Sequence, residues 1–532
     1  MNNEIDFLRN ILKKDEKEHW HLYEKSVTTV NQNTYFLLKK SSSQSQPAGS
    51  GDFLSGKKSE PFAWPGTFGQ KTLGIFSVNK DHAVASGFEP FKQLQIVDAG
   101  SKSGWLAFCP ADSKNLSALA KMLPNLSPSP LKTAPSFGFG DRLGIANPGH
   151  IRAVNKFRGI LPVFAQQSIR ELIKTKRNYR DVIDSSAWSV FQEGYKGKWG
   201  ADADHLKYEK DLLDAIKSGC TMFTIDTSEY LNEEPFNLKN GNNESTENKV
   251  KDHSSCEGQD YLKNALKRYS GKKIKKDNYC LQYNDDNVTE LFLVYNRAID
   301  FVSKIYSFIK ENTGDFDFEV SFDETKTVTS PEAHYFIANE LASREIDFTS
   351  LALKFPGEFF KGIDYIGNLG EFKEAILVHG DIAKIFGSYK MSLHSGSDKF
   401  SVYPDFFKYT SGNFHVKTSG TSWLEALNVI SKCNPSLFRK IYGIAYNNFE
   451  LNKKDYHLVL KKSELPESIA GQRDKNLQEL LFDSRIRQCL HISYGTILDN
   501  LGEQLYGILN DNEEMHYSYV CDYIEKHLGL LS

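Results

Sequence analysis

Two spacings of apolar positions alternate along most of the chain after residue 130. Segments 204–219, 330–344, 369–387 and 422–432 carry apolar residues three and four positions apart, which is the spacing of one helix face. Short apolar runs between them predict strands at 136–141, 161–166, 221–226, 318–324, 348–354, 389–395, 414–419 and 489–495. Eight strand-helix units in this order predict an α/β fold, a (β/α)8 TIM-type barrel with parallel strands.

Two stretches depart from this alternation. Residues 1–130 contain short strand-like runs, polar punctuation and a Pro/Ser-rich end, which predicts an N-terminal α+β region and linker before a barrel at 131–532. Residues 237–278 are polar and lysine-rich with few large apolar side chains, so we expect a surface insertion in the barrel. The interval 420–488 is long enough to hold additional helices.

Composition limits the classes of function. The 65 Lys and Arg residues nearly balance the 68 Asp and Glu residues, giving a formal charge of −3, which argues against nucleic-acid or membrane partners. The 7 cysteines are scattered without a Cys-x-x-Cys pair, so neither a disulfide framework nor a zinc ribbon is indicated. No signal peptide or membrane span is evident. We expect a cytoplasmic protein acting on a small molecule, and a homo-oligomer is compatible with the sequence.

The predicted strands end in chemically active side chains. Barrel enzymes build their active sites from residues at the carboxyl ends of the strands. Helix capping explains Asp226 and Thr418 well, but it does not explain so many cations and carboxylates on one face. The polar residues at these ends are Asp141, Arg142, Gln166, Gln167, Asp226, Glu319, Asp323, Glu324, Lys354, the run from His394 to Lys399, Lys417, Thr418, His491 and Ser493.

Four histidines are candidate metal ligands, because each begins a helix on the catalytic face or ends a strand there: His150, His205, His334 and His394. Three imidazoles with carboxylates nearby can bind one divalent cation such as Mn, Zn, Ni or Co and leave positions open for substrate. A hydrogen bond at a helix N-terminus is the alternative for each of them. Position in the predicted barrel alone leaves all four histidines open as ligands.

Nine sequence blocks between Phe137 and Gly495 resemble the tagaturonate epimerase family of bacterial hexuronate metabolism. The blocks are GFGDRLG, FAQQSIRE, WGADADHLK, FTIDTS, EVSFDET, KGIDYIG, YKMSLHSGSDKFSVYP, VKTSGTSWLEAL and RQCLHISYG. The resemblance covers little of residues 1–100 or of the 237–278 insertion. It implies a metal-dependent epimerase that interconverts D-tagaturonate and D-fructuronate, two open-chain keto sugar acids.

The resemblance also assigns residues. It implies that Asp204 is an acid/base carboxylate beside the metal ligand His205, that Glu319 is the acid/base counterpart, and that His394 is a ligand. We choose His334 as the third ligand beside His205 and His394 from its position in the predicted barrel, with His150 as its replacement. The substrate carboxylate needs a cation, for which Arg142, Lys399 and Lys417 are candidates. Ser395 is expected to bind sugar hydroxyls, and Gln166 is a further expected substrate-binding residue.

The chemistry leaves two mechanisms open. The epimers differ at carbon 3 counted from the carboxylate and the ketone is at carbon 5, so enolisation of the ketone cannot invert carbon 3. Retro-aldol cleavage between carbons 3 and 4 with re-addition would do so, with a metal as Lewis acid. Direct removal and return of the proton at carbon 3 would use the same two carboxylates.

Two other functions remain open at this point. The first is an epimerase or aldolase for a neutral ketose on the same barrel. The second is a non-catalytic sugar-acid sensor, because fold alone does not establish activity.

Overall fold

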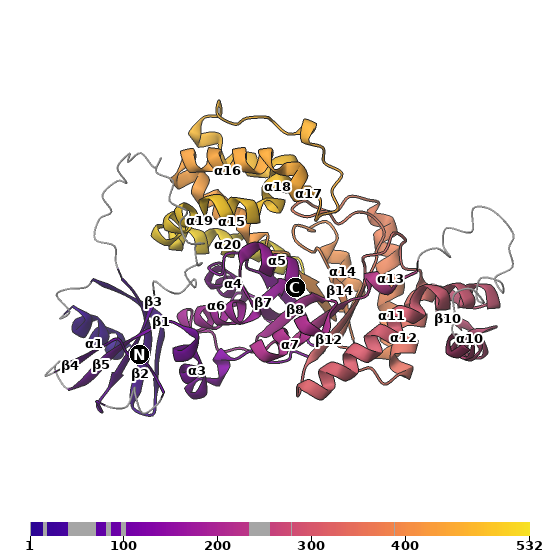
Figure 1. Ribbon diagram of the computed structural model, residues 1–532, viewed down its shortest axis with the longest axis horizontal. Helices are drawn as coiled ribbons and strands as arrows, with labels where there is room; N and C mark the ends of the chain where they lie inside the picture. The colour runs from indigo at the N-terminus through magenta and orange to yellow at the C-terminus, as the bar shows by residue number, and fades with distance from the viewer. Residues whose placement is uncertain are drawn as a thin grey trace.

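The computed structural model describes residues 2–13, 19–40, 71–80, 87–96, 103–232, 256–277, 279–387 and 389–532. Its centre is a closed barrel of eight parallel strands, flanked in Figure 1 by the N-terminal sheet on one side and the last helices above. In barrel order the strands are β6 (Ser136–Gly140), β7 (Leu161–Ser168), β8 (Gly200–Leu206), β9 (Met222–Asp226), β12 (Asp317–Phe322), β13 (Ser350–Leu353), β14 (Lys390–Leu393) and β15 (Phe414–Lys417), and β15 pairs with β6. The predicted barrel is confirmed.

Two predicted features of the strands are corrected. Residues 489–495 are not a strand, because they span the end of a helix, Ser484–Ile492, and the start of the next, Tyr494–Asp511. The missing barrel strand is β8, which the sequence pattern did not reveal. Asp204 and His205 therefore lie on a strand and not at the start of a helix.

Helices follow the strands and cover the barrel from outside. They are α4 (Asn147–Val154), α5 (Ile169–Thr175), α6 (Tyr179–Gln192), α7 (Glu209–Ser218), α11 (Asp285–Asn312), α12 (Pro331–Ser343), α13 (Leu369–Phe386) and α14 (Tyr403–Tyr409). A further group packs around its own apolar core: α15 (Ser422–Cys433), α16 (Pro435–Asn447), α17 (Phe449–Lys453), α18 (Ser484–Ile492) and α19 (Tyr494–Asp511). Much of this group occupies the predicted long interval 420–488. The last helix, α20 (Glu513–Gly529), packs mainly against the core of the barrel.

The barrel strands keep the alternation of a sheet although both faces are buried. On β12, Phe318, Val320 and Phe322 belong to the large apolar core. The alternate residues of β12 are polar and buried, including Glu319, and β15 repeats the pattern with His415 and Lys417. The interior of this barrel is therefore polar, where branched aliphatic residues are the usual filling.

The N-terminal region contains an antiparallel sheet in the order β1 (Trp20–Val30), β2 (Asn33–Lys40), β3 (Lys71–Ser77), β5 (Gly104–Pro110) and β4 (Lys92–Ile96). The helix α1 (Asn2–Leu12) packs on it, and α3 (Ser113–Met122) follows it. Of the predicted insertion, residues 233–255 lie outside the described part. Its described residues form α10 (Cys256–Tyr269) and β10 (Lys273–Lys275), which pairs with β11 (Cys280–Gln282).

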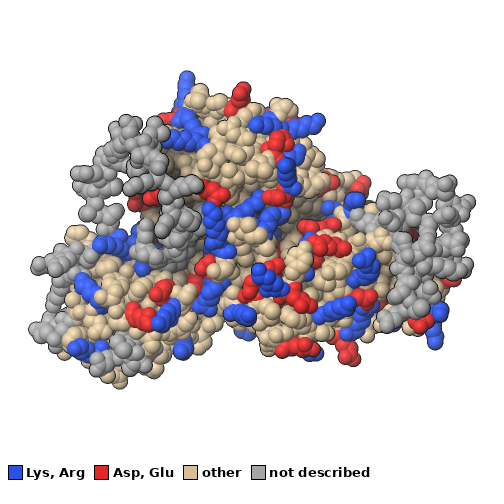
Figure 2. Space-filling view, in the orientation of Figure 1, with Lys and Arg blue, Asp and Glu red and all other residues tan. Residues whose placement is uncertain are grey.

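The described surface carries both signs of charge. Figure 2 shows Lys and Arg interspersed with Asp and Glu over the visible face. Among the described residues, no helix combines the length and apolarity needed to cross a bilayer. The six described cysteines are all free thiols.

Candidate active site

A cavity of about 790 Å³ opens at the carboxyl ends of the barrel strands. This volume suits a small organic ligand. Residues at the ends of β7, β8, β12, β13, β14 and β15 line it, and residues 454–457 after α17 complete the wall. The cavity therefore lies where barrel enzymes bind their substrates.

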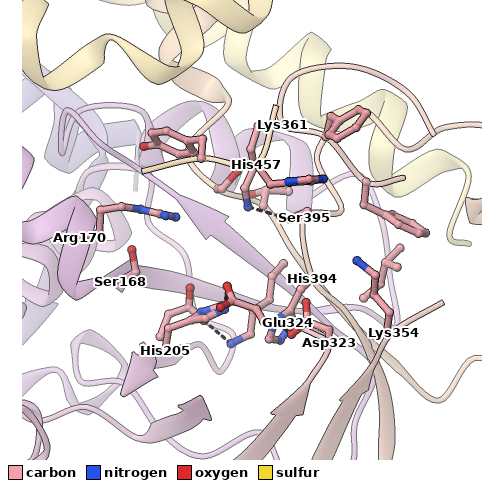
Figure 3. Close-up of a pocket in the computed structure, with 18 of the residues that line it drawn as sticks. Ser168, Arg170, His205, Asp323, Glu324, Lys354, Lys361, His394, Ser395 and His457 are labelled. Atoms are coloured by element: carbon pink, nitrogen blue, oxygen red, sulfur yellow. Dashed lines mark hydrogen bonds and ion pairs between the residues drawn. The ribbon is translucent and has the colours of Figure 1, made fainter. Parts of the chain in front are cut away.

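Three side chains at the floor of the cavity form a candidate metal site. One ligand atom from each of His205, Asp323 and His394 lies within 4.8 Å of the others. His205 is on β8, Asp323 directly follows β12 and His394 directly follows β14. Figure 3 shows the three side chains together, with Glu324 beside them. Two imidazoles and a carboxylate are a suitable donor set for a divalent transition metal.

The contacts of the two imidazoles support this assignment. His394 Nε2 lies 2.6 Å from Glu319 Oε1, whereas its Nδ1 is buried without a hydrogen bond, 3.3 Å from Asp323 Oδ1. His205 Nδ1 lies 2.9 Å from Asp204 Oδ1, although the angle is not that of a hydrogen bond, and its Nε2 faces Glu324 at 3.8 Å. His394 thus has one nitrogen toward a supporting carboxylate, Glu319, and one toward Asp323 of the group, as ligating histidines have.

The raised pKa values of His394 and His205 also favour a metal site. Burial disfavours the imidazolium of His394, but Asp323 and Glu319 outweigh burial and raise its pKa to about 10. For His205, Asp204 likewise overcomes burial and raises the pKa. Protons on these rings therefore supply positive charge that the carboxylates require, and a divalent cation would supply it instead. The residues fit a metal.

Two residues of the cavity wall, His205 and Ser395, have a left-handed backbone conformation. His205 has a φ of 60°, a left-handed conformation that is uncommon outside glycine. It lies in an irregularity of the β8–β9 pairing between Ala203 and Leu206. Such bulges redirect side chains next to active sites. Ser395, directly after His394, has a φ of 52°.

Below the candidate metal site, Lys417 joins three carboxylates. Its Nζ lies 2.7 Å from Asp202, 2.7 Å from Asp204 and 3.0 Å from Glu319, and it also donates to Thr224. Burial opposes ionisation of Asp204 and Glu319, but the neighbouring cations hold both pKa values well below their usual range. Burial raises the pKa of Asp202 to about 6 despite Lys417.

The cavity brings together most of the predicted residues. Those on its wall are Gln166, Asp204, His205, His394, Ser395 and Lys417. Glu319 is not on the wall: it is fully buried and accepts hydrogen bonds from Ser350 and His394. In this arrangement Glu319 orients His394 and does not face the cavity.

Two predicted substrate-binding cations serve other contacts. Arg142 donates from Nε to Glu171 at 3.0 Å and from Nη1 to the His491 carbonyl at 2.7 Å, and it lies over the Tyr494 ring. Lys399 donates to backbone carbonyls, including that of Phe360 at 2.8 Å. Neither lines the cavity. They stabilise the surrounding loops.

His334 lies apart from the candidate metal site, contrary to the prediction from its place in the chain. Its Nε2 is 2.7 Å from Tyr389 Oη and its Nδ1 is 3.1 Å from His379 Nδ1. Tyr389 precedes β14 and His394 follows that strand, so the two histidines lie toward opposite ends of the barrel. The replacement candidate His150 is also elsewhere, bonded to Asn147 and Ser422.

Sequence reasoning did not select three residues that the structure places on the cavity wall. Asp323 is the third member of the candidate metal group, in which His334 had been predicted. The sequence did contain an indication of Asp323, because this residue directly follows a strand in which apolar and polar residues alternate. Lys361 and Arg170 are cations of the wall. They lie in the KGIDYIG and FAQQSIRE blocks, but no strand-end position marked them.

Comparisons with known proteins identify the family of this chain. A sequence profile described as tagaturonate epimerase matches residues 68–531. The tagaturonate/fructuronate epimerase of Thermotoga maritima is 45% identical over 426 residues, which cover 80% of this chain and 86% of that protein. A glycerol-complexed crystal structure of the fructuronate-tagaturonate epimerase UxaE from Cohnella laeviribosi has a TM-score of 0.83 and 32% identity, covering 100% of this chain and 99% of that one. The native crystal structure of the same enzyme gives 0.83 and 32%, covering 98% and 99%. The chain therefore belongs to the tagaturonate epimerase family and is an epimerase, that is, an isomerase.

Proposed function

We propose that this epimerase interconverts D-tagaturonate and D-fructuronate with the help of one divalent cation held by His205, Asp323 and His394. The observation that carries the proposal is the convergence of these three side chains on the floor of a cavity of about 790 Å³. The names of the relatives from Thermotoga maritima and Cohnella laeviribosi supply the substrate pair. When bound, the cation would act as a Lewis acid toward the ketone and a neighbouring hydroxyl.

Asp204 is the proposed acid/base group. Its carboxylate lines the cavity, and Lys417 and His205 keep it ionised and therefore able to accept a proton. In the retro-aldol route Asp204 takes the proton of the carbon 3 hydroxyl. The bond between carbons 3 and 4 then breaks, its electron pair passes to carbon 4, and carbon 3 becomes an aldehyde. Rotation of the aldehyde and re-addition, with return of the proton, give the epimer.

Glu319 was expected to be the second acid/base carboxylate, and that assignment stays a prediction. Its full burial and its contacts to His394 and Lys417 favour a positioning role. Gln166 and Ser395 are proposed to bind hydroxyl groups, since both line the cavity. The side chain of Gln166 is held in place by a hydrogen bond from its Nε2 to the Thr418 carbonyl at 2.9 Å.

The test is to remove metal with a chelator, restore Mn, Zn, Ni, Co or Mg singly, and follow D-tagaturonate by proton NMR in deuterated water. D-fructuronate is expected only with a restored metal. Absence of deuterium at carbon 3 would support the retro-aldol route, and its incorporation would support direct exchange. Turnover of neutral D-tagatose but not of the uronate with any metal would overturn the assignment.

A further inference from the structure

Two of the cations that line the cavity, Lys361 and Arg170, contact no carboxylate within the described residues. Lys361 Nζ donates to Ser395 Oγ at 2.7 Å, and Arg170 donates to the Asp455 carbonyl at 2.7 Å. Within the described parts of the chain, neither forms an ion pair with a carboxylate. In contrast, Lys417 contacts three carboxylates and is fully engaged.

The two cations approach the same space. In Figure 3, Lys361 and Arg170 enter the cavity from the side opposite His205 and Asp323. Arg170 is near enough to oppose protonation of Lys361, whose pKa burial lowers to about 8. A half-buried ammonium beside a guanidinium is unfavourable unless an anion joins them.

The position also suits the substrate. Ser395, which holds the Lys361 ammonium, is the residue directly after the candidate ligand His394. A ligand on the metal group can therefore extend toward Lys361 along one wall. Arg170 is held at its other side by the Tyr456 ring, 4.5 Å from the guanidinium carbon.

We infer that Lys361, with Arg170 beside it, binds the carboxylate of the sugar acid and sets the preference for uronates over neutral ketoses. This inference rests on the proposed function, because it takes a keto sugar acid as the substrate. It replaces the predicted cations Arg142, Lys399 and Lys417, whose donors are occupied within the protein. Ser395 is a positioning residue for the Lys361 ammonium.

The test compares K361M and K361R with K354M. Lys354 is another of the lysines that line the cavity, and its replacement controls for the loss of one positive charge. Metal-loaded enzymes of equal metal content are assayed with D-tagaturonate and with neutral D-tagatose. K361M is expected to raise KM for the uronate about 10- to 100-fold, the worth of a charge-assisted hydrogen bond, with a much smaller change in kcat. K361R should retain most affinity, and turnover of D-tagatose should not fall.

A binding measurement separates this inference from the proposed function. D-altronate, in which an alcohol replaces the ketone, and neutral D-altritol are titrated calorimetrically into the wild-type enzyme and the variants. Loss of D-altronate binding in K361M alone supports the subsite even if the wild type does not epimerise the uronate. Equal losses for acid and neutral ligands, or a larger loss in K354M than in K361M, would overturn the inference. If K361M does not fold by circular dichroism, K361Q takes its place.

Discussion

Replacement of Lys417 by methionine should destabilise the barrel strongly. Methionine keeps the length and apolar stem of lysine but leaves three buried carboxylates, Asp202, Asp204 and Glu319, without their shared cation. At the observed separations of 2.7 to 3.0 Å, each attraction is about 6 kcal/mol at an effective dielectric constant of about 20. Desolvation of the ammonium offsets much of this, and loss of one partner from a buried ion pair costs about 3 to 5 kcal/mol. We expect a cost in this range for Lys417→Met at pH 7.5.

Lys390→Met is the matched control. Lys390 is also buried in the barrel interior, but it donates to the Ser136 hydroxyl, and burial lowers its pKa to about 8. Its ammonium is therefore less well compensated, and its replacement should cost less than half as much as that of Lys417.

The measurement is urea unfolding of the metal-free proteins followed by tryptophan fluorescence at pH 7.5 and pH 5. In the wild type, Asp204 and Glu319 have depressed pKa values, so their stabilisation is present above the unfolded pKa values and falls as pH is lowered. In Lys417→Met these pKa values should rise above the unfolded ones, so stability is lost as pH rises. The difference between the two proteins should therefore be larger at pH 7.5. A cost equal to that of Lys390→Met, or no change with pH, would refute the reasoning.

Three further predictions concern the cavity. His394→Asn should abolish stoichiometric metal binding measured by elemental analysis, whereas His334→Gln should leave metal content unchanged because His334 bonds Tyr389 and His379; equal losses would contradict the assigned ligands. Asp204→Asn should lower kcat of the metal-saturated enzyme about 10²- to 10⁴-fold. Glu319→Gln should chiefly weaken metal affinity, about 10- to 100-fold by equilibrium dialysis. The reverse, a large loss of kcat in Glu319→Gln and weaker metal binding in Asp204→Asn, would restore Glu319 as the acid/base group. Burial lowers the pKa of Lys361 to about 8, so its ammonium is lost above that pH and kcat/KM for the uronate should fall there. In Lys361→Arg this fall should move to higher pH. An unchanged pH profile in that variant would exclude Lys361 as the source of the fall.

The strands that the sequence revealed are those whose outward residues are large and apolar. In β12 and β15, Phe318, Val320 and Val416 face the helices and give the alternation, even though their inward neighbours are charged. The false strand at 489–495 shows the limit of this signal. Its residues Leu490 and Ile492 alternate over a short run, but helical continuation from Ser484 decides the structure, and a short apolar run does not distinguish the two.

The sequence could not show which protein cation is available to bind the substrate carboxylate, and the reason is a different one. Arg142, Lys399 and Lys417 lie at predicted strand ends, as expected of binding residues. Whether a cation is available to a ligand depends on which protein groups have already neutralised it, and these partners are remote in sequence. Arg142 donates to Glu171, Lys399 donates to the carbonyl of Phe360, and Lys417 donates to the carboxylate of Asp202. Lys361 is available because the protein gives it a hydroxyl and no carboxylate.

The strand that escaped prediction is the one that carries the most chemistry. Residues Gly200–Leu206 offer Gly, Ala and Asp, which are poor strand formers, so their pattern resembles a helix start. The inward positions of β8 are Asp202 and Asp204, which share Lys417, and the bulge at its end turns His205 toward the candidate metal group. Each of these features serves the site at the expense of local strand propensity. A segment that resists classification by pattern, yet is needed to complete a fold, is therefore a good place to seek catalytic residues.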